Sequence, residues 1–294
     1  MPELPEVENV RRTLEPHLLD RWVRGVWVYR PDVINGVPLA YDLLNQGRIR
    51  RLLRKGKQLA IETYDRRAIC VHLGMSGQLY WKQGVGHSPS VSAGPRPDHV
   101  HLQWRIEPDE NAARDAVNGG GDSGTGLLIF RDPRRFGEVA TYRDARVLLE
   151  QRWNELGPDA LTIEPSQLSP ILRGTRRAIK AVLLDQRALA GVGNIYADES
   201  LFVAGIKPTR VARTLKTAEV ERLCGAIRQV LQNAVGAGGS TLRDFKNADE
   251  QPGRYAQFHQ VYGRGGAACV RCGGVLTSRT LGQRTTVWCK VCQR

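Results

Sequence analysis

The chain begins with the stretch MPELPEVE, residues 1–8, and the apolar residues after it extend this stretch into a helix. They recur at the spacing of one helical face: Val7, Val10, Leu14 and Leu18. A proline such as Pro5 suits the first turn of a helix. A later proline removes a backbone donor, so we expect the helix to end or kink at Pro16. Packing of the apolar face would fix residues 2 and 3 in space.

Pro2 is small enough for the initiator methionine to be removed, which would leave a proline with a free secondary amine. An N-terminal amine has a reference pKa near ~8, so part of it is neutral and nucleophilic at physiological pH. Glu3 places a carboxyl group beside anything that this amine attacks. The alternative is that Pro2 and Pro5 only stiffen the entry into the helix.

Length and charge limit the class of protein. A chain of 294 residues suits two domains with a small appendage. The formal net charge of +13 predicts a polyanionic partner, either nucleic acid or an anionic membrane surface. No run approaches the ~18 apolar residues of a membrane span, and glutamates occupy the place of a signal peptide's apolar core. We therefore expect a cytoplasmic protein, nucleoid-associated in a prokaryote, that binds nucleic acid.

Short runs typical of β-strands fill the first half of the chain, at residues 22–29, 58–64, 68–73, 99–106 and 127–130. The clearest alternation predicts a half-buried strand and consists of Val100, Leu102, Trp104 and Ile106. Repeated short strands separated by turns predict an antiparallel β-sandwich or barrel.

Several predicted turns carry residues suited to nucleic acid. Residues 48–57 contain six Lys or Arg and no carboxylate, and Lys57 lies at the turn into a strand. The turns HLGMSG (72–77) and DPRRFG (132–137) place apolar side chains beside arginines, which suits insertion into a base stack. The alternative for the methionine of the first turn is an ordinary position in the hydrophobic core. We expect residues 83–97 and 107–126 to form mobile surface loops.

From about residue 144 the pattern becomes helical. One helix is marked by Ile179, Val182 and Leu183, and a longer one by Val220, Leu223, Ile227, Val230 and Leu231. Between them the turn GVGN (191–194) opens another helix with Asn194 at its cap. Backbone N–H groups at such a turn bind phosphate readily, although the same residues also make an ordinary helix cap.

The last segment carries two CxxC pairs, whose spacing is that of a zinc site: Cys269, Cys272, Cys289 and Cys292. Four thiolates predict one closed, tetrahedral, structural zinc ion with no open position for catalysis. Residues 251–294 contain seven Lys or Arg and no acidic residue, so we expect this segment to lie on a phosphate backbone. Cys70 and Cys224 are expected to be buried small hydrophobes.

Together these motifs resemble the formamidopyrimidine-DNA glycosylase family of repair enzymes for oxidised purines. The resemblance extends to LGPDAL (156–161), AIKAVLLDQ (178–186), GVGNIYADESLF (191–202) and QVYGR (260–264). The related endonuclease VIII branch begins with a PEGPE-like stretch, so Leu4 favours the purine branch.

The resemblance implies an α+β fold. An N-terminal antiparallel β-sandwich catalytic domain with a leading helix would span residues 1–143. A helix–two-turn–helix domain would follow at residues 144–250, and a zinc finger with four cysteine ligands at 260–294. The partner would be damaged double-stranded DNA, bound by a monomer.

The resemblance also assigns roles to residues. It implies that Pro2 is the nucleophile and Glu3 the acid, with Lys57 and Arg284 stabilising phosphate charge. The wedge that replaces a flipped base would be Met75, Arg134 and Phe136. Phosphate contacts would be Lys180, Asn194 and Arg176. The family's removal of the base would be followed by β,δ-elimination at the abasic site, through a Schiff base on the proline.

Some positions depart from the family. A DNA-contacting histidine is missing where this chain has Arg96-Pro97, the acidic stretch 107–126 resembles an insertion, and residues 252–259 are variant. Two alternatives remain open: an oxidised-pyrimidine glycosylase that uses the same amine, and a DNA-binding zinc protein that has lost its chemistry. The second is disfavoured because Pro2, Glu3 and Lys57 are all present.

Overall fold

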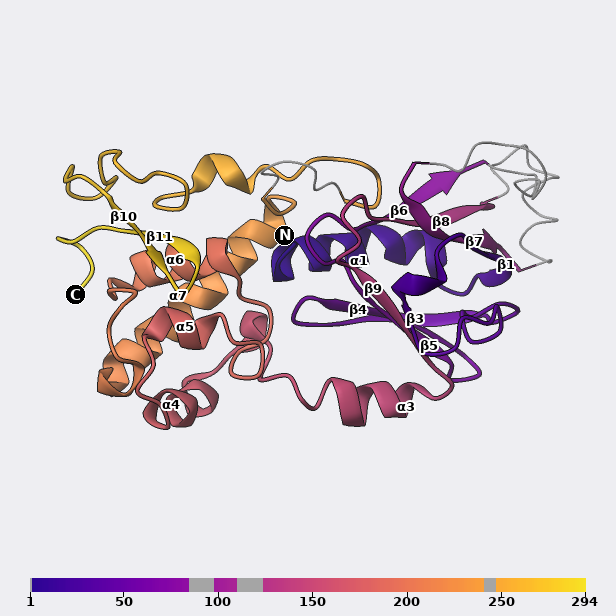
Figure 1. The fold of residues 1–294 in the computed structure, drawn as a ribbon, viewed down its shortest axis with the longest axis horizontal. Coiled ribbons are helices and arrows are strands. Elements are labelled where there is room, and N and C mark those ends of the chain that lie inside the picture. The colour runs from indigo at the N-terminus through magenta and orange to yellow at the C-terminus, as the bar shows by residue number, and fades with distance from the viewer. Residues whose placement is uncertain (1, 85–97, 110–123, 241–246) are drawn as a thin grey trace. The chain divides into compact units, whose positions relative to one another are not determined.

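The computed structural model describes residues 2–84, 98–109, 124–240 and 247–294, which form two compact units (Figure 1). The β unit comprises Met1–Pro2, Glu6–Trp153 and Thr241–Gly253. The helical unit comprises Glu3–Pro5, Asn154–Ser240 and Arg254–Arg294. The expected loops at 83–97 and 107–126 lie mostly outside the described residues. The domain limits expected at residues 143, 250 and 260 stay predictions, because the two units exchange short segments.

Two sheets build the β unit. The four-stranded sheet has the order β1 (Trp22–Val28), β7 (Val100–Glu107), β8 (Gly126–Arg131) and β6 (Gln78–Gln83). The five-stranded sheet has the order β2 (Ile34–Asn35), β9 (Glu138–Tyr142), β5 (Ala68–His72), β4 (Gln58–Thr63) and β3 (Ile49–Lys55). Apolar residues from both sheets share one core. The expected sandwich is confirmed, with one exception to its antiparallel pairing: β2 runs parallel to β9.

The five predicted strands are present with ends that differ by one residue, and the described residues of the β unit contain four others that were not predicted: β2, β3, β6 and β9. The strand β3 lies inside the basic stretch 48–57. It is an edge strand, and Arg50 and Arg51 are exposed on it while Ile49 and Leu52 are buried. Exposed positions of an edge strand accept charged residues. The basic residues therefore interrupted the apolar pattern from which a strand is predicted.

The prediction that β7 is half-buried is wrong. Its polar face is buried as well, with His101 3% and Gln103 6% exposed. Both side chains have partners: His101 Nε2 lies 2.8 Å from the carbonyl of Asp132, and Tyr29 Oη donates to Gln103 Oε1 at 2.9 Å. Hydrogen bonding is what makes buried polar groups tolerable. The alternation of apolar and polar residues therefore predicted the strand correctly, but it did not predict that the polar side chains are buried.

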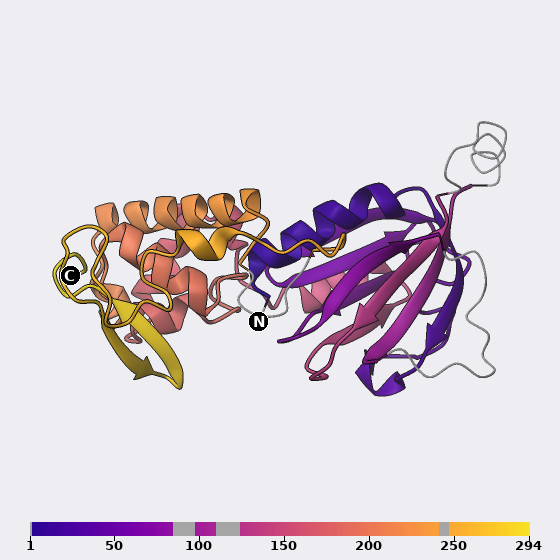
Figure 2. The same ribbon diagram turned by 90° about the horizontal axis from the view of Figure 1, so that it is seen from above.

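The helix α1 spans Leu4–Leu18 and is the long indigo helix of Figure 2. Its residues Val7, Val10, Leu14 and Leu18 belong to the β-unit core. The sequence predicted an end or a kink at Pro16. The end is wrong by two residues, since Pro16 lies inside the helix, which runs to Leu18. A proline lacks a backbone donor and its ring crowds the carbonyl four residues earlier, but the bonds of the following residues are still available: the N–H of Leu19 donates to the carbonyl of Glu15 at 3.1 Å.

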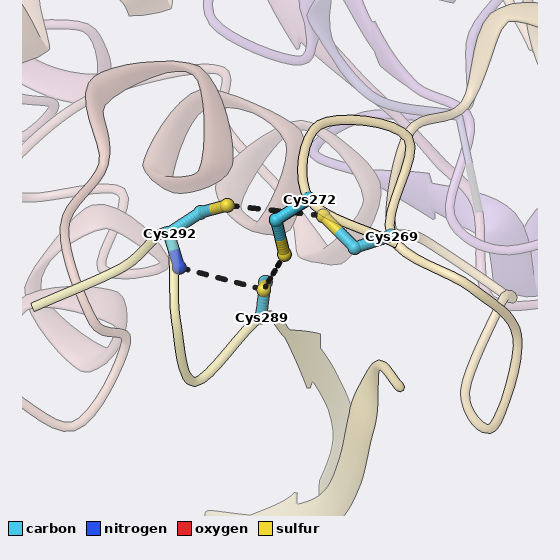
Figure 3. A group of neighbouring side chains, drawn as sticks. All are labelled: Cys269, Cys272, Cys289 and Cys292. Atoms are coloured by element: carbon cyan, nitrogen blue, oxygen red, sulfur yellow. Dashed lines mark hydrogen bonds between the residues drawn. The ribbon is translucent and has the colours of Figure 1, made fainter. Parts of the chain in front are cut away.

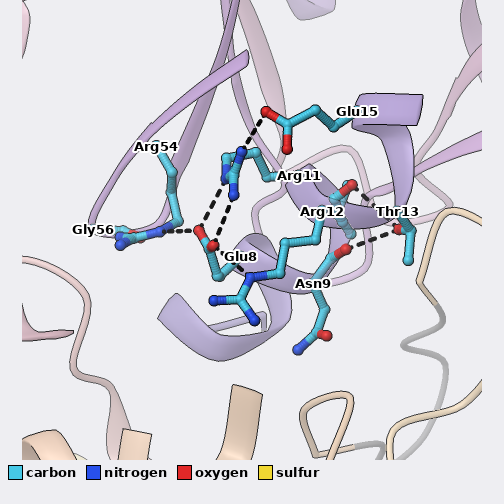
Figure 4. Close-up of polar contacts among 9 residues, drawn as sticks. Glu8, Asn9, Arg11, Arg12, Thr13, Glu15, Arg54 and Gly56 are labelled. Atoms are coloured by element: carbon cyan, nitrogen blue, oxygen red, sulfur yellow. Dashed lines mark hydrogen bonds and ion pairs between the residues drawn. The ribbon is translucent and has the colours of Figure 1, made fainter. Parts of the chain in front are cut away.

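Glu8 on α1 is a buried carboxylate shared by three arginines (Figure 4). Arg12 Nε and Arg11 Nη2 donate to its Oε1 at 2.8 and 3.1 Å, and Arg54 Nε donates to its Oε2 at 2.9 Å. Burial alone would raise the pKa of Glu8, but the hydrogen bonds from these arginines lower it to about 2. The ionised carboxylate therefore stabilises the folded β unit.

The helical unit contains α4 (Pro165–Arg173), α5 (Ile179–Leu183), α6 (Asn194–Ala204) and α7 (Thr217–Gly236), followed by the hairpin β10 (Thr277–Leu281) and β11 (Arg284–Trp288). The two helices predicted around Ile179 and Val220 are confirmed. In the β unit, β9 is followed by α3 (Ala145–Val147) and a π-helical turn, Leu148–Arg152. Short 3₁₀ turns are Pro31–Val33, Ala160–Thr162, Ala212–Thr214 and Tyr255–Phe258. Across the described ranges, none of the helices has the length and apolar character needed to traverse a bilayer.

We predict that Glu8→Gln destabilises the β unit at neutral pH but not in acid. A carboxyl group whose folded pKa is lowered contributes stability above its unfolded pKa and loses it as pH falls toward the folded value. With a pKa lowered from 4.5 to about 2, the contribution is present above pH 4.5 and disappears toward pH 2. Urea unfolding at pH 7 should show a loss of roughly 2–3 kcal/mol, and at pH 2, the folded pKa, most of that loss should vanish.

Glu15→Gln is the matched control, because Glu15 bonds the same Arg11 but is 36% exposed on its side chain. An exposed ion pair contributes less than about 1 kcal/mol. An equal loss for Glu8→Gln at both pH values would contradict the assignment of a charged, stabilising Glu8.

Candidate active site

The carboxylate of Glu3 lies at the first turn of α6. The N–H of Gly193 donates to Glu3 Oε2 at 2.7 Å and the N–H of Ile195 donates to Oε1 at 3.0 Å. Glu3 is only 3% exposed. An anion is favoured at a helix N-terminus by the unsatisfied N–H groups and by the helix dipole. The backbone N–H groups of this turn, for which the sequence left phosphate binding and an ordinary helix cap open, therefore bind this chain's own carboxylate.

The glycines of this turn make room for the N-terminal residues. A Cβ added to Gly193 would lie 2.3 Å from Glu3 Cδ. Gly191 has φ +114°, and its carbonyl accepts a hydrogen bond from the N–H of Leu4 at 3.1 Å. Leu4 is fully buried in the core of the helical unit. The expected cap is corrected here: Gly193 is the N-cap and Asn194 is the first residue of the helix.

A buried ion pair joins α5 to α6. Lys180 Nζ lies 2.6 Å from Asp198 Oδ1, and both side chains are at most 4% exposed. Burial raises the pKa of Asp198 to about 6, against the attraction of Lys180. Burial likewise lowers the pKa of Lys180, against the attraction of Asp198. Burial therefore disfavours the charged form of each group, and the attraction between the two groups opposes this effect.

The same pair holds the start of β11. Lys180 Nζ also donates to Thr286 Oγ1 at 2.8 Å and to the carbonyl of Thr285 at 3.3 Å. The N–H of Val287 donates to Asp198 Oδ2 at 3.1 Å. Three oxygen partners match the three donors of an ammonium group. A phosphate contact by Lys180, as expected from the sequence, would require exchanging one of them, and that role stays a prediction.

Arg284 is the first residue of β11 and is exposed. It follows the turn Gly282–Gln283, in which both residues have positive φ. The next carbonyl, that of Thr285, accepts Asn194 Nδ2 at 2.9 Å. Lys180, Asn194 and Arg284 are therefore brought together, and Lys180 and Arg284 line a cavity of about 580 Å³ between α5 and the hairpin. Arg176 is exposed in the connection between α4 and α5.

Glu199 is a second buried acid of α6 that the sequence analysis missed. It accepts backbone N–H groups from three successive residues, at 2.8–3.1 Å: Gln260, Val261 and Tyr262. Burial raises the pKa of its carboxyl group. Its signal was present in the sequence, because two adjacent acids in a helix of mainly apolar residues require buried partners.

In the β unit, the two turns expected to form a wedge pack against each other. Ser76 Oγ donates to Asp132 Oδ1 at 2.5 Å, and a Cβ on Gly74 would lie 2.4 Å from the backbone of Phe136. Met75 is 43% and Phe136 56% exposed, and the Arg134 guanidinium lies 5.1 Å from the Phe136 ring centroid. The structure thus brings the three wedge residues together on one exposed pair of turns. Lys57 follows β3 at the turn into β4 and is 7% exposed.

The four cysteines of the CxxC pairs point toward one another (Figure 3). Their sulfur atoms all lie within 4.8 Å of one another, with Cys272 and Cys289 at 3.5 Å and Cys269 and Cys292 at 3.9 Å. The cluster fits a metal ion, and four thiolates are typical of structural zinc. Cys70 and Cys224, by contrast, are fully buried away from it, as predicted.

Family models match two parts of the chain. The formamidopyrimidine-DNA glycosylase N-terminal domain matches residues 1–139, and the formamidopyrimidine-DNA glycosylase H2TH domain matches residues 156–246. The chain belongs to the formamidopyrimidine-DNA glycosylase family. A relative of that name from Shewanella oneidensis is 40% identical over 299 residues, covering 100% of this chain and 99% of the relative. One from Xanthomonas campestris is also 40% identical, over 300 residues and 100% of both chains.

Solved structures of family members share the fold. The MutM (Fpg) protein of Thermus thermophilus matches with TM-score 0.80 at 35% identity, over 99% of this chain and 98% of that one. A Lactococcus lactis Fpg variant in complex with Fapy-dG-containing DNA matches with TM-score 0.83 at 30% identity, over 100% of both chains. Lactococcus lactis Fpg with abasic-site DNA matches with TM-score 0.81 at 30% identity, over 99% of both.

We predict that Gly193→Ala displaces Glu3, because its Cβ would overlap the carboxylate. A group shifted by about 1 Å can cost on the order of 100-fold in rate, so base excision should fall to that extent. Gly225→Ala is the matched control, since its Cβ would meet nothing within 4 Å and alanine favours a helix. Single-turnover excision by the two variants measures the effect. Similar excision rates for both variants would show that the position of the Glu3 carboxylate does not affect base excision.

We predict one zinc ion per chain by elemental analysis, and its loss in Cys289→Ser. Metal binding supplies folding free energy to so small a module, so the hairpin should lose amide protection while the β unit stays folded. Cys224→Ala, which alters a buried thiol outside the cluster, should keep the zinc. A wild-type protein that is folded and metal-free through residues 269–292 would overturn the metal assignment.

Proposed function

We propose that this protein removes oxidised purines, such as 8-oxoguanine and formamidopyrimidines, from duplex DNA and then cleaves the abasic site by β,δ-elimination. Family membership gives the class of reaction. One observation supports the residue assignment: the carboxylate of Glu3 is fixed by hydrogen bonds from the N–H groups of Gly193 and Ile195. Glu3 directly follows Pro2 in the chain. Pro2 is itself buried.

The chemistry requires removal of Met1, after which Pro2 carries a free secondary amine. The damaged nucleotide is rotated out of the duplex, and the exposed side chains of Met75, Arg134 and Phe136 fill the space that it leaves. The neutral Pro2 nitrogen attacks the anomeric carbon of the sugar. The proton that the attacking nitrogen loses passes to the Glu3 carboxylate, which donates it to the ring oxygen as the sugar opens. The base leaves with the glycosidic electron pair and takes up a proton from water.

The resulting iminium cation draws electrons from the neighbouring sugar carbon and makes its proton acidic. Loss of that proton expels the 3′ phosphate, and a second elimination expels the 5′ phosphate. Lys57 and Arg284 stabilise the phosphate charge in these two steps. Hydrolysis of the imine then releases the sugar fragment and restores the amine.

Other residues hold the DNA or the fold. Asn194, Lys180 and Arg176 contact the phosphate backbone, where a net charge of +13 gives the protein a general attraction to DNA. One zinc ion bound by Cys269, Cys272, Cys289 and Cys292 would supply structural stability to the hairpin that carries Arg284. We further propose that the protein acts as a monomer in the cytoplasm, on the nucleoid of a prokaryote.

The decisive experiment blocks the Pro2 amine. Retention or extension of Met1 converts the amine into an amide, whose delocalised lone pair cannot form an iminium. Such a protein should bind a duplex with one 8-oxoguanine but release no base and give no borohydride-trapped adduct. Glu3→Gln is the matched comparison: the amine survives, so trapping on a pre-made abasic site persists while base removal falls. If an extended protein, verified intact by mass spectrometry, still cross-links to the duplex, the nucleophile lies elsewhere.

A further inference from the structure

The turn that carries Lys57 is one of the tightest connections in the β unit. The ladder between β3 and β4 closes with Lys55 opposite Gln58, which leaves only Gly56 and Lys57 in the turn. Gly56 has φ +56°, a conformation that glycine adopts without strain. The direction of the Lys57 side chain is therefore set by how this two-residue turn is held.

One side of the turn is held by α1. Arg54 Nη1 donates to the carbonyl of Gly56 at 3.0 Å, and Arg54 Nε donates to Glu8 Oε2 at 2.9 Å (Figure 4). The side chains of Arg54 and Glu8 are each only 8% exposed. A planar guanidinium can make both bonds at once because its donors point in fixed directions. Arg54 thus connects the Lys57 turn to the helix that begins directly after Pro2 and Glu3.

The other side of the turn is held independently. Lys55 Nζ donates to the carbonyl of Trp153 at 2.6 Å. Trp153 Nε1 and Arg152 Nε both donate to Gln58 Oε1 at 3.0 Å. These contacts do not involve Arg54, so loss of Arg54 would remove its bond to Gly56 while β3 and β4 remain paired.

We propose that Arg54, fixed by Glu8, is a positioning residue for Lys57: it ties the Lys57 turn to the helix that presents Pro2 and Glu3. This inference rests on the proposed function, in which Lys57 stabilises phosphate charge during elimination. Arg54 touches no reacting atom in this mechanism and acts only through the turn.

The arginines around Glu8 provide a matched control. Arg12 donates to Glu8 Oε1 at 2.8 Å, but its side chain is 54% exposed. No contact of Arg12 with the turn is found across the described residues, whereas Arg54 reaches Gly56. Arg12→Met therefore removes one cation from Glu8 without removing the connection to Lys57.

The experiment is a double-mutant cycle on the elimination step. Wild type, Arg54→Met, Lys57→Met and the double variant are given a duplex with a pre-formed abasic site, and single-turnover strand cleavage is measured. We expect Arg54→Met to slow cleavage on the order of 10- to 100-fold, since small displacements of a charge-stabilising group have large effects. In the Lys57→Met background the same change should have little further effect, because residues that act through one another are not additive.

Two further variants test whether the effect depends on the hydrogen bonds of Arg54 and not on its charge alone. Arg54→Lys keeps the charge but lacks the fork of donors that spans Glu8 and Gly56, so it should remain slow. Arg12→Met should cleave at the wild-type rate. Thermal unfolding of each variant, and binding to undamaged duplex, should show that all are folded and retain similar affinity for DNA.

The outcomes distinguish a failure of the Arg54 inference from a failure of the proposed function. If the wild-type protein cleaves and Arg54→Met cleaves at the same rate, the inference about Arg54 is overturned but the proposed function is not. An equal slowing by Arg54→Met in the wild-type and Lys57→Met backgrounds would also overturn it, because Arg54 would then act independently of Lys57. A wild-type protein that cleaves neither abasic-site nor 8-oxoguanine duplexes would overturn the proposed function and this inference with it.

Discussion

The hydrogen bonds from Gly193 and Ile195 to the Glu3 carboxylate are the interaction on which the rest of the structure depends. They join residues 190 positions apart in the chain. A carboxylate at a helix N-terminus satisfies N–H groups that have no partner inside the helix. The bond between Leu4 and Gly191 adds a backbone connection beside them. Residues 3–5 consequently belong to the helical unit, whereas α1 packs its later turns into the β-unit core.

Helix α6 extends this organisation through its buried acids. Its first turn binds Glu3, Asp198 binds Lys180 and the backbone of β11, and Glu199 binds three successive amides after residue 259. Buried charges are costly unless every oxygen has a partner, so these contacts fix the chain segments that provide them. The hairpin that carries Arg284, which lies between the two CxxC pairs, is one of those segments. A single helix therefore determines the surroundings of the proposed acid and of Arg284.

Much of the fold and the family could be read from local patterns. The amphipathic spacing of α1 and α7, five of the strands, the CxxC pairs and the two wedge turns each depend on residues close in sequence, and all are present in the structure. Prediction failed where the outcome depended on distant partners. Charge concealed the edge strand β3, alternation in β7 concealed a buried polar face, and α1 continues two residues past the end expected at Pro16.

The sequence by itself determined which chemical groups this protein has: the adjacent Pro2 and Glu3, a lysine on a tight turn, four cysteines at the spacing of a metal site and an excess of positive charge. Only the tertiary structure decided what those groups contact. The glycine turn that could bind phosphate binds Glu3 instead, Lys180 is buried against Asp198, and Arg54 connects Glu8 to the Lys57 turn. The physical reason is that composition and spacing set charge and local geometry, whereas burial and hydrogen-bond partners come from segments far apart in the chain.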